Sequence, residues 1–220
     1  MISLTLVSAC CLVAMTGFAL AGQSPIPLPQ PRHDGDVSVE HALRARRSAR
    51  AYRSDALTMA DVSQVLWAAQ GITDPEGLRT APSAGALYPL EVYLVATNVG
   101  GLAQGVYKYA PDGHALIPTI QGERRTALAK AALSQECVSD APAALVFAAV
   151  YARTAKKYGD RAERYAHIEV GHAAENVYLQ AGAMRMGTVM VGAFDDKAVA
   201  RALELPKNEA PLAIMPLGKR

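Results

Sequence analysis

The sequence predicts an α+β fold, in which helices flank a mixed β-sheet, and three observations support this. Hydrophobic residues make up 51% of the 220 residues and charged residues 19%, a balance typical of a chain with a folded core. Segments with strand-like and helix-like patterns follow one another irregularly. One helical segment, at about residues 163–186, is rich in alanine and much longer than the others. We expect it to form a long central helix.

Residues 1–21 carry no charged side chain and end in Ala19-Leu20-Ala21, the small-x-small pattern that signal peptidase accepts. We interpret them as a signal peptide, although the usual positive n-region is missing, and therefore expect an exported, periplasmic protein. Two alternatives remain open: a lipoprotein cleavage site at Cys10, or an uncleaved anchor, since about 20 apolar residues can span a bilayer. Only these alternatives predict contact with a membrane.

Four prolines stand at every second position from Pro25 to Pro31, within residues 22–36. This pattern is typical of an extended linker without a helix, so we place the folded domain at residues 37–220. Removal of the signal peptide would leave Cys137 as the single cysteine. No internal disulfide could then form, and we expect Cys137 to be a small buried hydrophobe rather than a nucleophile.

Capping residues and apolar spacing predict four further helices. Ser38 is placed to cap a helix that ends near Arg46. Thr58 and Asp61 form a capping-box pattern before a helix that ends at Gly71. The other two helices are predicted at residues 123–133 and 196–203.

Six strands are predicted from alternating or continuous apolar runs. Two of them flank the turn Pro111-Asp112-Gly113 and should form a hairpin. A continuous apolar run at residues 143–151 is typical of a strand that is buried on both faces. The predicted strands cover residues 91–97, 105–109, 115–120, 143–151, 188–191 and 212–217.

The charge balance and motif content exclude several functions. The chain has 22 Lys and Arg against 20 Asp and Glu, a net charge of +2, and only 6% aromatic residues. This argues against a nucleic-acid partner, which needs a concentrated basic face or a stacking platform. The five histidines are scattered, so no metal site is expected. The spacing of Glu169 and His172 would suit a di-iron helix, but no second pair exists, and we interpret His172 as a hydrogen-bonded core residue.

Basic and small residues gather in four places. The run Arg46-Arg47-Ser48-Ala49-Arg50 holds three guanidinium groups, whose planar forks match a phosphate monoester; a solvated surface run is the alternative. A small-residue turn covers residues 82–89, and a second turn with a glycine covers residues 190–195. The chain ends with Gly218-Lys219-Arg220.

Taken together and in this order, these segments resemble the nitroreductase-like FMN oxidoreductases, and most closely their SagB-type branch, which includes the azoline oxidases of peptide-toxin biosynthesis. The resemblance covers about residues 37–220. It implies an FMN cofactor, a homodimer, and hydride transfer through the flavin. Its most specific stretches are RRSARAY, LTMADVSQVLWAAQGIT, RTAPSAGALYPLEVYLV, GVYKY, KKYGDRAERYAHIEVGHAAENVYLQA, GAFDD and the terminal PLG.

The resemblance implies roles for the basic residues. In this family an Arg-x-Ser-x-Arg/Lys element binds FMN, which here corresponds to Arg46, Ser48 and Arg50. Arg46 would contact the phosphate, and Arg50 would lie at the N1/C2 edge of the ring, where a cation stabilises the anionic reduced flavin. Arg47 would face solvent. The family's final basic pair at the phosphate corresponds to Lys219 and Arg220.

The two turns are implied as further flavin contacts. Val191 and Gly192 would present backbone groups near N5 of the ring. Ser83, Ala84 and Ala86 would reach across a dimer interface to the partner's flavin, although Ala86 stands where many relatives have asparagine. The residues of the long helix that suit close packing against a second helix are Ala173, Ala174, Ala181 and Ala183.

Lys157 and Tyr158 match a Lys-Tyr pair that is linked to catalysis in the azoline oxidases. We expect the pair in a loop or at a helix start, where Lys157 would remove a proton as hydride leaves the substrate. The alternative is that Lys157 is solvated and Tyr158 packs. Because the extra domains of the peptide-processing relatives are absent from this sequence, we expect a small organic substrate, with NAD(P)H as the candidate donor. A flavin carrier without turnover, a peptide azoline oxidase, and a fold that has lost FMN are the alternatives.

Overall fold

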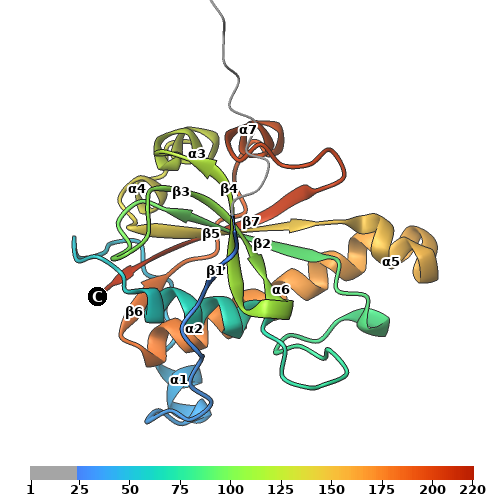
Figure 1. Ribbon diagram of the computed structural model, residues 1–220, viewed down its shortest axis with the longest axis horizontal. Helices are drawn as coiled ribbons and strands as arrows, with labels where there is room; N and C mark the ends of the chain where they lie inside the picture. Colours follow the sequence, from blue (N-terminus) through green and yellow to red (C-terminus); the bar gives the residue numbers. More distant parts are fainter. Residues whose placement is uncertain (1–23) are drawn as a thin grey trace, which may run out of the picture.

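The computed structural model describes residues 24–220 of the chain. The signal peptide predicted at residues 1–21, with its alternatives, lies outside this part. The described chain forms one seven-stranded sheet with helices on both faces, which confirms the α+β class (Figure 1). No helix within residues 24–220 is both long and apolar enough to cross a membrane.

The sheet has the strand order β1-β4-β3-β2-β5-β7-β6, and every pair of neighbouring strands is antiparallel rather than mixed. β5 and β6 run in the same direction, but the last strand, β7, lies between them. The strands are β1 (Ile26–Pro27), β2 (Leu90–Ala96), β3 (Gly105–Ala110), β4 (Ala115–Gln121), β5 (Ala143–Ala149), β6 (Met186–Thr188) and β7 (Ala210–Lys219).

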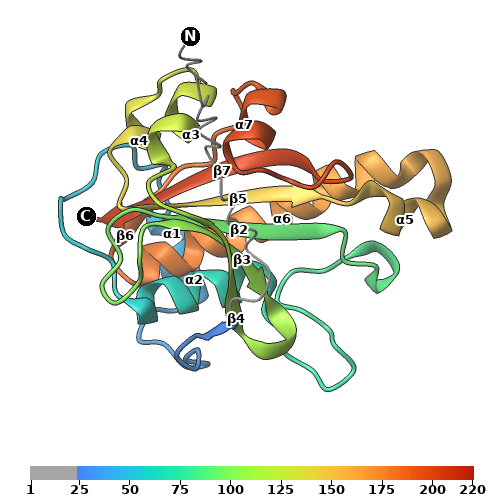
Figure 2. The ribbon, with the colours of Figure 1, turned by 45° about the horizontal axis from the view of Figure 1, so that its top comes forward.

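The helices form two layers, with α2 and α6 on one face of the sheet and α3, α4 and α7 on the other (Figures 1 and 2). The predicted caps are confirmed: the Ser38 side chain accepts the His41 amide, and Thr58 with Asp61 forms a capping box. The helices are α1 (Val39–Ala45), α2 (Met59–Gln70), α3 (Arg125–Ala131), α4 (Glu136–Ser139), α5 (Tyr151–Tyr158), α6 (Ala162–Ala183) and α7 (Asp196–Ala202).

Burial confirms two predictions about the core. All seven residues of β5 are buried between the two helical layers, as the continuous apolar run predicted. Cys137 is buried in α4 and has no disulfide partner in the described chain. The alanines of α6 are a correction, because Ala173, Ala174 and Ala181 pack into the protein's own core, which includes α2, instead of facing a helix of a partner chain.

Two element boundaries differ from the predictions for local reasons. The strand predicted at residues 143–151 ends at Ala149, because its partner β2 begins only after Pro89, and Tyr151 starts α5. The helix predicted to reach Met186 ends at Ala183, because Arg185 adopts a left-handed φ of 56° that lets the chain turn into β6. The predicted strand at 188–191 is therefore split between β6 and a separate bridge from Val191 to Ile214.

The segment predicted as a linker is extended but attached to the domain. Its residues Ile26 and Pro27 pair with β4, and Leu28 is buried in the core beneath them. Gln64 of α2 hydrogen-bonds both the amide and the carbonyl of Arg32, at 2.8 and 2.9 Å. The interpretation of residues 22–36 as a free linker is therefore wrong for this part, since its apolar residues find partners on the sheet.

Leu28→Ala should accordingly destabilise the protein. The side chain is only 5% exposed, and truncation of a buried leucine costs about 2–5 kcal/mol in free energy of unfolding. Urea denaturation measures this, with the exposed neighbour Gln30→Ala as the control. A change below about 0.5 kcal/mol, as for an ordinary surface site, would show that the segment is not part of the folded unit.

Candidate functional site

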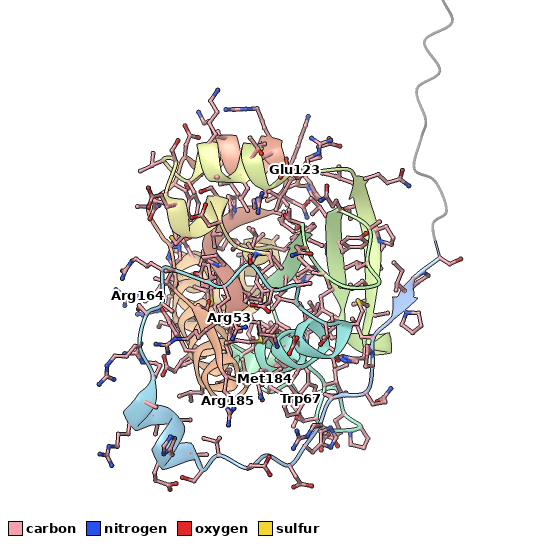
Figure 3. All side chains as sticks on the ribbon, turned by 90° about the vertical axis from the view of Figure 1, so that its left-hand side faces the viewer. Arg53, Trp67, Glu123, Arg164, Met184 and Arg185 are labelled. Carbon is pink, nitrogen blue, oxygen red and sulfur yellow. The ribbon has the colours of Figure 1, made fainter. Side chains whose placement is uncertain are left out.

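The basic run after α1 lies along the edge of the sheet, beside β6 and the end of β7. The Ala49 amide donates to the Thr188 carbonyl at 2.9 Å. Two glycines permit this approach: a Cβ at Gly187 would lie 2.7 Å from that of Ala49, and a Cβ at Gly218 would lie 2.6 Å from Tyr52. The run and the C-terminus therefore meet, and we call Arg46, Ser48, Arg50, Lys219 and Arg220 the basic end. Figure 3 faces this side, with Arg53 and Arg185 labelled.

The first residues of the run are held by α6. The Arg46 guanidinium lies 5.1 Å from the centre of the Tyr178 ring and 3.8 Å from a carboxylate oxygen of Glu175. The hydroxyls of Ser48 and Tyr178 are 3.2 Å apart. Arg47 is exposed and donates only to nearby backbone carbonyls, as expected for the odd residue of the run. Tyr178 was not anticipated from the sequence, where it appears as one more aromatic residue in a long helix.

Lys219 is less available than predicted, because its ammonium contacts Asp61 at 2.7 Å. Burial alone would raise the pKa of Asp61, but the hydrogen bonds from Lys219 and Thr58 outweigh it and hold the pKa below its ordinary value. Lys219 thus ties the end of β7 to the start of α2. By contrast, Arg50 and Arg220 form no ion pair within residues 24–220.

The second turn offers one backbone donor rather than two. The amide of Val191 donates to Ile214 at 2.8 Å and its carbonyl accepts from Ile214 at 3.0 Å, so neither group is free, and the position of Val191 near N5 stays a prediction. Gly192 is exposed, and its amide donates to no backbone group of the described chain. Gly192 therefore remains the candidate contact in this turn.

The small-residue turn at the other end of the sheet has an unusual backbone. Gly85, Ala86 and Tyr88 all have left-handed φ values, of 64°, 52° and 44°. Such a conformation costs a non-glycine residue roughly 1–2 kcal/mol, so the surroundings must hold it. The Ser83 hydroxyl accepts the Tyr88 amide at 2.9 Å, and the Ala84 amide donates to a carboxylate oxygen of Glu169 at 2.9 Å.

Lys157 and Tyr158 converge on this turn. They occupy the last turn of α5 instead of a loop or a helix start, and Gly159, with a φ of 53°, ends the helix after them. A Cβ at Gly85 would lie 3.1 Å from Nζ of Lys157 and 3.0 Å from the hydroxyl of Tyr158. The structure therefore brings the predicted catalytic pair to the turn that contains Ser83, Ala84 and Ala86. We call these five residues the turn cluster.

Glu169 supports the turn cluster and was not assigned this role from the sequence. Its side chain is 4% exposed, and burial raises its pKa. The sequence contains one indication of this role: Glu169 is a charged residue that shares the buried face of α6 with Ala166 and Ala173. The interpretation of His172 as a hydrogen-bonded core residue is wrong, because it is exposed and lines a cavity of about 250 Å³ with Glu169.

A raised pKa for Glu169 predicts a direction for the pH dependence of stability. The folded protein binds the Glu169 proton more tightly than the unfolded chain does, so the contribution of Glu169 to the free energy of unfolding should fall as pH rises above about 4.3. Glu169→Gln keeps the acceptor for the Ala84 amide but cannot ionise, and should reduce this fall. Urea denaturation between pH 4 and 7 measures it; identical pH profiles for both proteins would contradict the prediction.

The basic end and the turn cluster lie far apart in one chain. Lys219 is the last residue of β7. The turn cluster lies beyond the opposite end of β7, where Ala210 pairs with Ala149 and the Val150 amide donates to the Pro89 carbonyl. Nine residue steps along β7 correspond to about 30 Å. Figure 2 shows the C-terminus on one side of the molecule and α5 on the other.

The donors of the basic end fit a phosphate monoester. Guanidinium forks and a hydroxyl are among the groups that bind phosphate in proteins, and Arg46, Arg220 and Ser48 supply them. The nearest carboxylates engage only Arg46, at 3.8 Å, and Lys219. The residues present are thus compatible with the phosphate of FMN.

Comparison with known proteins gives the family. The nitroreductase family profile matches residues 43–219. A protein of Methanocaldococcus jannaschii, named "Putative nitroreductase MJ1384", is 46% identical over 185 residues, which cover 84% of this chain and 92% of the relative. A crystal structure of a protein from Anabaena variabilis, described as a "putative nitroreductase", is 30% identical to this chain, with a TM-score of 0.72. That match covers 81% of this chain but only 37% of the longer Anabaena chain.

A further solved structure resembles nearly the whole chain. It is the microcin synthetase McbBCD complex of Escherichia coli with truncated pro-MccB17 bound, and the match is 25% identical with a TM-score of 0.68. It covers 98% of this chain and 84% of the matched chain. The family profile spans most of the sequence and the archaeal relative is closely similar over nearly its full length, so the chain belongs to the nitroreductase family.

Proposed function

We propose that the protein is an FMN-dependent oxidoreductase of the SagB-type branch, which transfers hydride between the flavin and a small organic substrate. The observation that carries this proposal is the convergence of Lys157 and Tyr158 on Gly85, inside the turn of implied flavin contacts. Bound FMN supplies the ring atom, N5, that accepts or gives hydride. The chain's own residues hold the cofactor and place a proton-carrying group beside the substrate.

The residues of the basic end would hold the cofactor. Arg46, Ser48 and Arg220 are the candidates for the phosphate, and Arg50 is the candidate for the N1/C2 edge of the ring. Lys219 acts indirectly in this proposal, because its contact with Asp61 fixes the strand that carries Arg220. Gly192 offers its amide from the neighbouring turn.

We further propose that the active form is a homodimer with two equivalent sites. The separation of about 30 Å along β7 supports this, because one small cofactor cannot touch the basic end and the turn cluster of the same chain. A two-fold axis would bring the partner's turn cluster to the basic end. The apolar surface near α1 is consistent with a partner: Val39 and Leu43 are 64% and 54% exposed, beside a groove of about 320 Å³ between α1, α2 and α6.

Leu43→Asp should weaken the dimer and, with it, FMN retention. The substitution places a charge in the proposed interface, where burial of an unpaired carboxylate is unfavourable. Light scattering should give twice the chain mass for the original protein and a shift toward monomer for the variant. Leu133→Asp, at a 66% exposed leucine next to α3, is the matched control. A monomer that retains FMN and is active would overturn the homodimer.

The oxidoreductase itself is tested by its colour and its reduction. The purified protein should be yellow, and NADH or NADPH under anaerobic conditions should bleach the flavin bands, with reoxidation by a quinone or a nitroaromatic compound. A yellow protein that no donor reduces would indicate a flavin carrier. A colourless protein that takes up no added FMN would overturn both the oxidoreductase and the flavin carrier.

A peptide azoline oxidase is the second candidate. The similarity to the microcin synthetase structure over 98% of this chain favours it, together with the Lys157-Tyr158 pair. Oxidation of a synthetic azoline peptide, measured beside quinone reduction, separates the two functions. Turnover of the peptide alone would favour the peptide oxidase.

Export to the periplasm also remains part of the proposal. It rests on the apolar residues 1–21 and the small-x-small pattern Ala19-Leu20-Ala21 at their end. Cell fractionation tests the location, since a protein found only in the cytoplasm would contradict it.

A further inference from the structure

A separate cavity lies at the side of the sheet, between β2, β3, α5 and the loop that follows α2. Its volume is about 360 Å³, which is within the range of about 300–1,000 Å³ typical of small-molecule sites. The polar part of the lining consists of Arg79, Lys108, Arg153, Gln70, Glu91 and Asp112. The basic end does not contribute to this cavity.

Arg79 is the one guanidinium of this lining that has no carboxylate at ion-pair distance in the described chain. One of its terminal nitrogens donates to Gln70 at 2.9 Å, and its guanidinium lies 4.4 Å from the centre of the Tyr88 ring. Its Nε is buried and has no hydrogen-bond partner within residues 24–220. Burial lowers the pKa of Arg79, and the more distant Glu91 and Asp112 offset this only in part.

Three other charged residues of the cavity, Lys108, Arg153 and Glu91, are paired. Lys108 lies 3.3 Å from Glu91 and 2.8 Å from Glu209, and Arg153 pairs with Glu91. Tyr93 donates its hydroxyl to the second oxygen of Glu209 at 2.7 Å. Buried charges are normally paired, because an uncompensated one is costly. Among the cations of this cavity, the half-buried Arg79 is therefore the one without an ion pair in the described chain; the exposed Asp112 likewise forms none.

We propose that this cavity binds a small organic acid, whose carboxylate pairs with Arg79. A carboxylate matches the geometry of a guanidinium and would accept from the terminal nitrogen of Arg79 that makes no hydrogen bond in the described chain. Leu90, Tyr109 and Ile117 line the rest of the cavity and would contact an apolar body; Ile117 is 38% exposed there. A phosphate dianion fits less well, because Glu91 and Asp112 belong to the same lining.

Calorimetric titration of the full protein with two monocarboxylates, benzoate and hexanoate, and with their neutral amides tests the proposal. At least one acid should bind saturably, and its amide should bind at least about tenfold more weakly, because a charge-assisted contact is lost. Arg79→Met should weaken binding of that acid by a similar factor. Arg124→Met, at an arginine paired with Glu204 elsewhere, should leave it unchanged.

Three results would overturn the proposal. The first is no saturable binding of either acid at concentrations up to about 10 mM, the second is equal binding of an acid and its amide, and the third is inorganic phosphate binding as tightly as the acids. The comparison of acids with amides uses the unsubstituted protein, so it decides the question even if Arg79→Met fails to fold. The measurement does not depend on bound flavin.

Discussion

Arg46→Ala should raise the dissociation constant of FMN ten- to a hundredfold. The phosphate of the cofactor carries about 1.5–2 negative charges near neutral pH, and a charge-assisted contact to it contributes on the order of 1.5–3 kcal/mol. The fold should survive, because the Arg46–Glu175 contact is loose, at 3.8 Å, and partly exposed. Fluorescence titration of the protein with FMN measures the change.

Arg47→Ala is the matched control for Arg46→Ala. The two arginines are neighbours, but Arg47 is exposed and donates only to the carbonyls of Arg44 and Arg46. Its removal should leave the dissociation constant of FMN within about threefold, as for an ordinary surface site. If both substitutions weaken FMN alike, or neither does, the assignment of Arg46 to the phosphate is wrong.

The parts of the fold that the sequence predicted well depend on neighbouring residues. The Ser38 cap, the Thr58–Asp61 capping box and the turn at Pro111–Gly113 each act over a few residues, so their signals are visible in the sequence. The burial of β5 was also predicted, because a run of seven apolar residues has no polar face to expose.

The features that were missed depend on contacts between distant residues. Nothing local indicates that β7 inserts between β5 and β6, so the antiparallel sheet could not be distinguished from a mixed one. The proline-rich segment has the composition of a linker, yet Leu28 finds a place in the core and Gln64 binds Arg32. Composition reflects only the segment itself, whereas its position in the structure depends on the core and on α2, which it contacts.

In the candidate site too, residue types could be predicted from the sequence, whereas contacts between distant residues could not. The resemblance gave the residue types of the basic end and the turn cluster, and the structure groups them accordingly. It could not show that Asp61 engages Lys219, or that Ile214 engages the Val191 backbone. Glu169 was considered only for a metal site, because its contact with Ala84 spans 85 residues of sequence.

Lys157→Ala should separate two kinds of activity in the proposed enzyme. If Lys157 removes a proton as hydride leaves a C–H bond, oxidation of such a substrate should fall at least ~100-fold. Reduction of the flavin by NAD(P)H and its reoxidation by a quinone require no such proton removal and should remain nearly unchanged. Anaerobic flavin reduction, quinone turnover and oxidation of an azoline peptide are the three assays.

Lys156→Ala provides the control, since this lysine precedes Lys157 in α5 and is exposed. Only the lysine whose Nζ approaches the turn, at 3.1 Å from the Cβ position of Gly85, should affect proton removal. Tyr158→Phe keeps the ring that packs against Tyr165, at 5.1 Å between ring centres, and removes only the hydroxyl. It tests whether that hydroxyl acts with the lysine.

A structural role for Lys157 predicts a different pattern. The lysine and Tyr158 both lie against the strained turn, so loss of the lysine would then loosen the turn and release FMN. All three activities would fall together, in proportion to the flavin lost, and added FMN would restore them. A selective loss that excess FMN does not restore is the result that proton removal requires, because only then is the cofactor held while one chemical step is slow.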